Sequence, residues 1–195
     1  MPRRLIIDLT LHSQPAGLRG VTERLFLSRY GGESTRHLMM KLLSYLLLYR
    51  EGLEIERSAG QHYKPDLLQN GPEGRPRLWV DCGATAPKKL VEVVRKNRAA
   101  HVVIVKATPS ELRHYHRLTV KRIKDVERVS YIAPKADFLA HIGAAFESGG
   151  RAVEAHISSQ IKLLIEGREF VTGLSTFGRP LYEGHAWSET SSSIW

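Results

Sequence analysis

The run Val102-Val103-Ile104-Val105 limits the fold of this chain more than any other segment. Four β-branched residues in succession favour a strand, and a continuous apolar run is typical of a strand that is covered on both faces. Helical sequence over 86–98 precedes the run, with Pro87 suited to the first helical turn. Thr108-Pro109 suits the start of another helix after it. This strand–helix order predicts an α/β core.

Further elements extend this core in both directions. Alternating apolar residues predict a first strand over 3–12, and Ser34 is suited to cap a long helix. The strong turn Asn70–Gly74 predicts a hairpin between 66–69 and 77–83. We therefore expect a mixed central sheet flanked by helices, with antiparallel hairpin additions at both ends. The other predicted elements are strands at 23–27, 53–56, 126–132, 152–157, 160–165 and 169–175 and a helix at 135–146.

Two aspartates make the central hairpin a candidate metal site. Asp66 follows a proline at the start of the first hairpin strand, and Asp81 lies near the end of the second. Hard cations such as Mg²⁺ or Mn²⁺ take oxygen ligands, so carboxylates on adjacent strands can share one ion. The usual third member of such a nuclease site is a lysine two residues after the second acid, where this chain has Gly83. Because residues i and i+2 of a strand share a face, we expect Trp79, Asp81 and Gly83 on one face.

A lysine from elsewhere in the chain has to supply the missing charge. Lys88 and Lys89 open the helix after the hairpin, so we rank them first as catalytic residues, ahead of Lys64 and Lys106. The acids also have structural interpretations. A Pro-Asp step is often part of a turn, and Asp81 at a strand end can cap a helix or pair with an arginine.

Glu33 stands just before the long predicted helix. Its structural role would be favourable negative charge at a helix N-terminus, and its functional role would be a third carboxylate facing the same metal. The residues alone favour the structural role. The nine histidines show no metal-binding spacing, and His114 and His116 do not share a helical face, so we expect no zinc site.

Positive charge indicates the class of partner. The net charge is +9 and the isoelectric point is near 9.8, a balance that favours polyanions and nucleic acid first. Basic residues accumulate between 113 and 128, either as a phosphate-contacting stripe or as an ordinary solvated face. The candidate nucleic-acid-binding residues are Arg113, Arg117, Lys121, Arg122 and Lys124.

Composition also predicts where the protein works. At 195 residues the chain is most simply one domain, which we assign to residues 1–185, followed by a polar tail over 186–195. The apolar runs are too short to span a bilayer, and the N-terminal segment lacks the pattern of a signal peptide. The single cysteine, Cys82, fits a reducing compartment and is expected to be buried. We expect a cytoplasmic protein without membrane contact.

The combined pattern resembles the YaeQ family of bacterial proteins over about residues 3–182. The resemblance rests on Gly32-Glu33-Ser34 leading into Met39–Leu46, on Pro65-Asp66, and on Leu78–Gly83. Val102–Val105 is similar to a later core strand of the family. The segments Ile165-Glu166-Gly167 and Gly173–Phe177 are similar to its closing hairpin.

The resemblance implies a restriction-endonuclease-like fold of the PD-(D/E)XK type. It also implies an acidic cluster of Glu33, Asp66 and Asp81 that binds Mg²⁺ or Mn²⁺. Glycine in place of the nuclease lysine, as at Gly83, fits the family, whereas two hairpin aspartates depart from its frequent glutamates. The expected function is a metal-dependent nuclease or phosphodiesterase that acts on nucleic acid. The alternative is an inactive nuclease-fold protein that binds nucleic acid or a protein partner.

Overall fold

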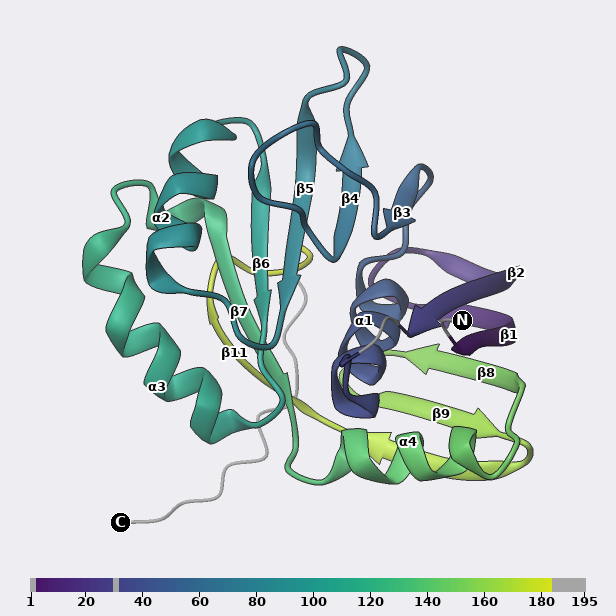
Figure 1. The fold of residues 1–195 in the computed structure, drawn as a ribbon. Coiled ribbons are helices and arrows are strands. Elements are labelled where there is room, and N and C mark those ends of the chain that lie inside the picture. Colours follow the sequence, from purple (N-terminus) through teal and green to yellow (C-terminus); the bar gives the residue numbers. More distant parts are fainter. Residues whose placement is uncertain (1–2, 30–31, 184–195) are drawn as a thin grey trace.

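The computed structural model describes residues 3–29 and 32–183, which form two mixed β-sheets and the helices packed on them (Figure 1). The mixed α/β class predicted from the sequence is confirmed. The predicted end of the domain at residue 185 and the polar tail over 186–195 lie outside the described residues.

The larger sheet carries the acidic hairpin. It consists of β3 (Leu53–Ile55), β4 (Leu67–Asn70), β5 (Pro76–Cys82), β6 (His101–Val105), β7 (Val129–Pro134) and β11 (Leu174–Gly178). The strand order is β11-β7-β6-β5-β4-β3. β5, β6 and β7 are parallel, whereas β4 pairs antiparallel with β5, as the hairpin prediction required. All five residues of the central strand β6 are buried, which explains its continuous apolar run.

Two helices cover one face of this sheet. α2 (Pro87–Lys96) and α3 (Pro109–Thr119) each have a proline in the first turn, where the missing N–H is tolerated. Their buried side chains pack with Trp79 of β5 in one hydrophobic cluster. The sequence predicted both helices with their prolines in place.

α1 (Thr35–Leu48) lies between the two sheets (Figure 1). The Ser34 side chain accepts a hydrogen bond from the backbone N–H of His37 and so caps the helix, as predicted. Every residue from Leu38 to Leu48 is buried, because the helix packs against both sheets and against α4 (Phe138–Glu147). Polar side chains on α1 are therefore held in a protein interior.

The smaller sheet joins the first two strands of the chain to three strands that come after residue 150. It consists of β1 (Arg3–Ser13), β2 (Leu18–Arg29), β8 (Ala152–Ile157), β9 (Ile161–Ile165) and β10 (Arg168–Thr172). Its order is β10-β9-β8-β1-β2, with β1 parallel to β8. The two predicted antiparallel additions thus form one separate sheet instead of extending the central one. Local sequence patterns carry no signal for this long-range pairing.

Two predicted boundaries were wrong. The strand expected over 169–175 is divided at Gly173, with β10 in the smaller sheet and β11 in the larger, so the chain crosses between the sheets there. Residues 126–128, expected to begin a strand, form the short 3-10 helix η2 (Val126–Arg128). The Arg128 guanidinium donates to the carbonyls of Val94 and Asn97, which fixes that turn beside α2.

His101 predicts a loss of stability in acid. Its Nε2 lies 2.6 Å from the Ser130 hydroxyl, which itself donates to the Arg179 carbonyl. Burial, with the charges of Arg179 and Arg50, lowers the pKa of His101 to about 4. In the unfolded chain the imidazole has an ordinary pKa of about 6.5, so as the pH falls it is protonated before the folded protein is. The contribution of His101 to the free energy of unfolding is therefore full above about pH 6.5 and is lost as the pH falls toward 4. We expect the free energy of unfolding to fall by roughly 2 kcal/mol between about pH 7.5 and pH 5.

Denaturant unfolding at both pH values measures this loss. His101→Gln should remove most of the difference, and the matched variant His114→Gln, at an exposed position on α3, should leave it unchanged. An equal pH dependence in His101→Gln and the parent protein would assign the effect to other groups.

Candidate functional site

Asp66 is held rigidly at the entrance to β4. Its backbone N–H donates to the Val80 carbonyl (2.8 Å), and its Oδ2 accepts a hydrogen bond from the Cys82 backbone N–H (2.7 Å). Its Oδ1 lies 3.0 Å from Nε2 of His37, on α1. The carboxylate is thus oriented by two strands and a helix while its side chain stays 22% exposed.

Asp81 lies deeper, with a side chain only 1% exposed. Its Oδ1 accepts a hydrogen bond from Lys89 Nζ (2.9 Å), whereas the buried Oδ2 has no hydrogen-bond partner among the described residues. Burial raises the pKa of Asp81 and the neighbouring negative charge of Asp66 adds to the rise, while Lys89 and the Trp79 indole oppose it. The two aspartates therefore form a like-charge pair, and Lys89 is the lysine that contacts Asp81 directly.

The four candidate lysines have different environments. Lys89 reaches Asp81 and also donates to the Lys64 carbonyl (3.2 Å), whereas Lys88 is exposed. Lys106 Nζ donates to the Gly83 carbonyl (2.5 Å) and lies 3.7 Å from the centre of the Tyr115 ring. Burial lowers the pKa of Lys106 to about 8.

Gly83 does not continue the face of Asp81, contrary to the alternation expected from the strand. Its φ is +73°, in the left-handed region, and a Cβ built there would lie 3.1 Å from His37 Nδ1 and 3.3 Å from Met40 Cε. The backbone turns at the end of β5, so position 83 points toward α1 while Trp79 and Asp81 point toward α2 and α3. His37 occupies the space that a side chain at position 83 would need.

A charged cavity of about 480 Å³ opens beside Asp66. Glu33 Oε1 lies 3.5 Å from His37 Nε2, which links it to Asp66 through the imidazole. Lys41, only 2% exposed, forms ion pairs of 2.5 Å with both Glu33 and Glu56. Burial lowers the pKa of Lys41, but the two carboxylates outweigh burial and the net pKa is raised, so Lys41 stays charged at neutral pH. The charged lining residues of the cavity are Glu33, His37, Lys41, Glu56, Lys64 and Asp66.

Three of these side chains, His37, Lys41 and Glu56, were not predicted as site residues. His37 and Lys41 follow the predicted Glu33 at intervals of four, which is the spacing of one helical face and was the available signal. Glu56 had no such signal, because its position depends on a backbone with φ of +59° just after β3. The site therefore extends along α1 further than the acids alone indicated.

The donor atoms fit a divalent cation only in part. The buried Asp81 Oδ2 forms no hydrogen bond among the described residues and is suited to a cation, and the negative charge of Asp66 is near enough to raise the pKa of Asp81. Within residues 3–29 and 32–183, however, Glu33, Asp66 and Asp81 do not form a group whose ligand atoms all lie within 4.8 Å of one another. Lys41 already neutralises Glu33. Asp66 and Asp81 are thus the better ligand candidates, and Glu33 contacts the site through His37.

The predicted nucleic-acid-binding residues lie on one continuous outer segment of the chain. All five are exposed on α3, the following 3-10 turn η1 (Val120–Arg122) and the loop after it. Arg128, from the same basic stretch, is instead committed to backbone carbonyls and Asp125. The exposed set is Arg113, Arg117, Lys121, Arg122 and Lys124.

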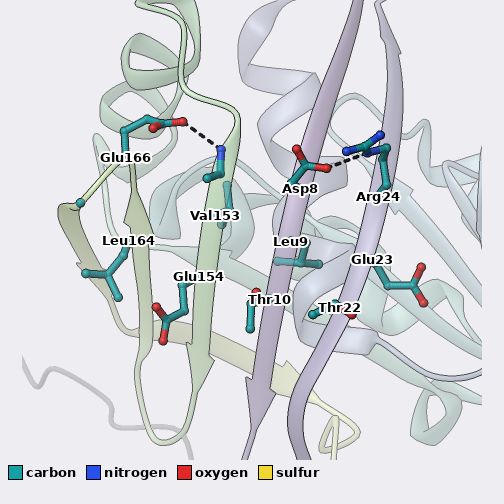
Figure 2. Close-up of a pocket in the computed structure, with 12 residues that line it drawn as sticks. Asp8, Leu9, Thr10, Thr22, Glu23, Arg24, Val153, Glu154, Leu164 and Glu166 are labelled. Atoms are coloured by element: carbon teal, nitrogen blue, oxygen red, sulfur yellow. Dashed lines mark hydrogen bonds and ion pairs between the residues drawn. The ribbon is translucent and has the colours of Figure 1, made fainter.

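A larger cavity, of about 800 Å³, lies on the smaller sheet, away from the acidic hairpin (Figure 2). Figure 2 shows the ion pair between Asp8 and Arg24 (2.7 Å) at its wall. Its charged lining comprises four acids and one arginine, which is unfavourable for a polyanion. These residues are Asp8, Glu23, Arg24, Glu154 and Glu166.

These features define a two-sheet α/β protein with a charged cavity between α1 and the central hairpin. The chain belongs to the YaeQ family, because the family model described as YaeQ protein matches residues 20–169. No match was found among curated proteins. None of the helices within the described residues is long and apolar enough to cross a membrane.

Two crystal structures of YaeQ proteins share the fold. The protein from Xanthomonas axonopodis pv. citri is similar with a TM-score of 0.78 and 18% identity, over 92% of this chain and 100% of that chain. The protein from Pseudomonas syringae has a TM-score of 0.77 and 17% identity, over 92% and 98% of the two chains. At such identities the similarity establishes the fold alone.

Proposed function

We propose that the protein is a divalent-metal-dependent nuclease or phosphodiesterase of the PD-(D/E)XK type, with Asp66 and Asp81 as metal ligands. One observation carries the proposal: Asp81 is a nearly fully buried carboxylate whose pKa is raised by burial and further by the negative charge of Asp66, and its Oδ2 forms no hydrogen bond among the described residues. Burying like charges in this way is costly, and a divalent cation would offset the cost. Mg²⁺ or Mn²⁺ would activate a bound water and stabilise negative charge on the phosphate.

The surrounding residues take distinct roles in this proposal. Lys89 holds the Asp81 carboxylate in place through the 2.9 Å contact. His37 occupies the space in front of Gly83 and contacts Asp66, so its imidazole replaces the absent lysine as the group that takes a proton from water or contacts phosphate. Lys41 neutralises Glu33 and Glu56 and so lowers the repulsion that the cavity would exert on a phosphate.

The test measures cleavage of DNA and RNA substrates with Mn²⁺ or Mg²⁺ by the purified protein and its variants. We expect Asp66→Asn and Asp81→Asn each to lower the cleavage rate by about 100-fold or more, the scale reached when a metal site is disturbed. Asp8→Asn, a surface aspartate paired with Arg24, is the matched control and should cleave at the parent rate.

Mn²⁺ titration by calorimetry separates binding from chemistry. Binding should be lost in Asp66→Asn and Asp81→Asn and retained in Asp8→Asn. Cleavage that survives both site substitutions would come from a contaminant and would end the proposal. His37→Gln should retain Mn²⁺ binding but lose turnover, because His37 is proposed to act on water or phosphate and not on the metal.

The alternative is a nuclease-fold protein that binds nucleic acid or a protein partner without cutting. It is favoured because, within the described residues, the ligand atoms of Glu33, Asp66 and Asp81 do not all lie within 4.8 Å of one another, and because Glu33 is engaged with Lys41. Gel-shift measurements with labelled DNA and RNA at low and high salt distinguish the two. Salt-dependent binding with no turnover in any metal supports the alternative, with the basic residues of α3 and η1 as the contact surface.

A further inference from the structure

A second group of ligand-type side chains lies on the outer face of the smaller sheet. His12 of β1 and His156 of β8 are register partners in the parallel strand pair, and Glu154 precedes His156 by two residues. Residues i and i+2 share a face, so all three side chains project from the same side of the sheet. The intervening residues Leu11 and Ala155 are fully buried on the opposite side. Spacing along the sequence gave no signal for this group, because strand pairing brings together residues that are 144 positions apart in the sequence.

The geometry of the three side chains is compact. The two imidazole rings stack with an interplanar angle of 3° and centroids 4.7 Å apart. Glu154 Oε1 lies 2.7 Å from His156 Nε2 and 3.9 Å from His12 Nε2. One ligand atom from each residue lies within 4.8 Å of the other two. Ligand atoms around a tetrahedral Zn²⁺ are about 3.4 Å apart at bond lengths of about 2.1 Å, and an imidazole binds a metal in the plane of its ring, so the two stacked rings have to rotate out of parallel to face one ion.

We propose that His12, Glu154 and His156 form a binding site for a Zn²⁺-class cation. Two imidazole nitrogens and one carboxylate oxygen are a ligand set that Zn²⁺ accepts, with the fourth position left to water. The side chains are 37% to 49% exposed, so an ion reaches them directly from solvent. Figure 2 shows Glu154 beside Thr10 of β1, its register partner, at the surface of the sheet.

The chemistry of this site differs from that of the acidic hairpin. Oxygen-only ligands such as Asp66 and Asp81 favour Mg²⁺ or Mn²⁺, whereas imidazole ligands favour Zn²⁺ and its transition-metal neighbours. The inference is independent of the proposed nuclease function. It concerns a cation that links β1 to β8, two strands that lie far apart in the sequence.

Binding requires one local change. His12 Nδ1 accepts a hydrogen bond from the Gly20 backbone N–H (3.1 Å), which leaves the ring proton on Nε2. Coordination through Nε2 moves that proton to Nδ1, and the exposed Gly20 N–H then bonds to water. Because the imidazoles must be deprotonated to bind a metal, acid competes with Zn²⁺ at this site.

The test is Zn²⁺ titration of the chelator-treated full chain by calorimetry, with excess Mg²⁺ present to saturate oxygen-only sites. We expect one Zn²⁺ per chain and a rise in the thermal unfolding midpoint. His12→Gln, His156→Gln and Glu154→Gln should each weaken binding by more than about 10-fold, the loss caused even by an outer-shell change. Co²⁺ should bind with the visible absorption of a tetrahedral site, and each of these variants should lose it.

His114→Gln, at an exposed position on α3, is the matched control and should bind Zn²⁺ like the parent. Asp81→Asn should also bind Zn²⁺ normally, so failure of the nuclease proposal and failure of this one are distinguishable. The site is disproved if the parent binds no Zn²⁺, or if binding persists in all three ligand variants. Circular dichroism of each variant confirms that lost binding is not lost folding.

Discussion

Replacing Lys41 by methionine is expected to lower the free energy of unfolding by about 3–5 kcal/mol, the cost of breaking a buried ion pair from one side. The methionine is unbranched like lysine and one heavy atom shorter, so it fills most of the same space on α1. It removes the charge that faces Glu33 and Glu56, both 2.5 Å from Lys41 and only 12% and 16% exposed. The carboxylates then repel each other in a place that water reaches poorly.

Denaturant unfolding at neutral pH measures the loss, and Lys96→Met is the matched control. Lys96 is also a helical lysine paired with a glutamate, Glu92, at 2.8 Å, but the pair lies on the surface. Its removal should cost only a small fraction of the loss expected for Lys41→Met, because water screens an exposed pair. Similar effects of the two substitutions would show that the Lys41 ion pairs contribute no more than a surface contact.

A double variant tests the physical reason. If the free energy of unfolding falls because the negative charges of Glu33 and Glu56 are left uncompensated, Glu56→Gln in the Lys41→Met background should restore part of it, because one of the two charges is removed. Glu56→Gln alone should be destabilising. If Glu56→Gln raises the free energy of unfolding in the Lys41→Met background and lowers it in the parent, the two residues interact. We expect an interaction energy of about 0.5–3 kcal/mol, the usual range for coupled neighbours.

The sequence predicted those parts of the structure that local chemistry determines. The Ser34 cap, the prolines that open α2 and α3, and the turn between β4 and β5 were all confirmed, because each depends on residues within a few positions. The buried Cys82 in β5 was likewise confirmed. The pairing of β1 with β8 was not predictable in this way, since it joins segments from opposite ends of the chain.

The candidate site shows the same division. Asp66 and Asp81 were found because a proline step and a strand end mark them, and Lys89 because it opens the next helix. His37 and Lys41 were missed because they lie on a helix whose sequence otherwise looks apolar. Only the packing of α1 against the hairpin brings them to Asp66.

Gly83 shows why a sequence motif and a site can differ. Restoring the expected nuclease motif by Gly83→Lys is predicted to destabilise the protein by about 2–5 kcal/mol and to bring no lysine to Asp81. The backbone at Gly83 is fixed in the left-handed region, with its N–H bonded to the Val105 carbonyl and its own carbonyl bonded to Lys106. About 1–2 kcal/mol of the cost is backbone strain, and the rest is contact with His37 and Met40 on α1.

Gly74→Lys separates the two contributions. Gly74 has nearly the same φ, +72°, but a Cβ there would meet nothing within 4 Å, so only the strain of about 1–2 kcal/mol is expected. Unfolding curves give the loss in the free energy of unfolding for each variant. The loss in Gly83→Lys minus the loss in Gly74→Lys is the packing cost at position 83. Any cleavage activity of the parent should survive Gly74→Lys and fall in Gly83→Lys, because the new side chain displaces His37 from Asp66. A stable and more active Gly83→Lys would show that position 83 accepts the nuclease lysine, and that His37 does not replace it.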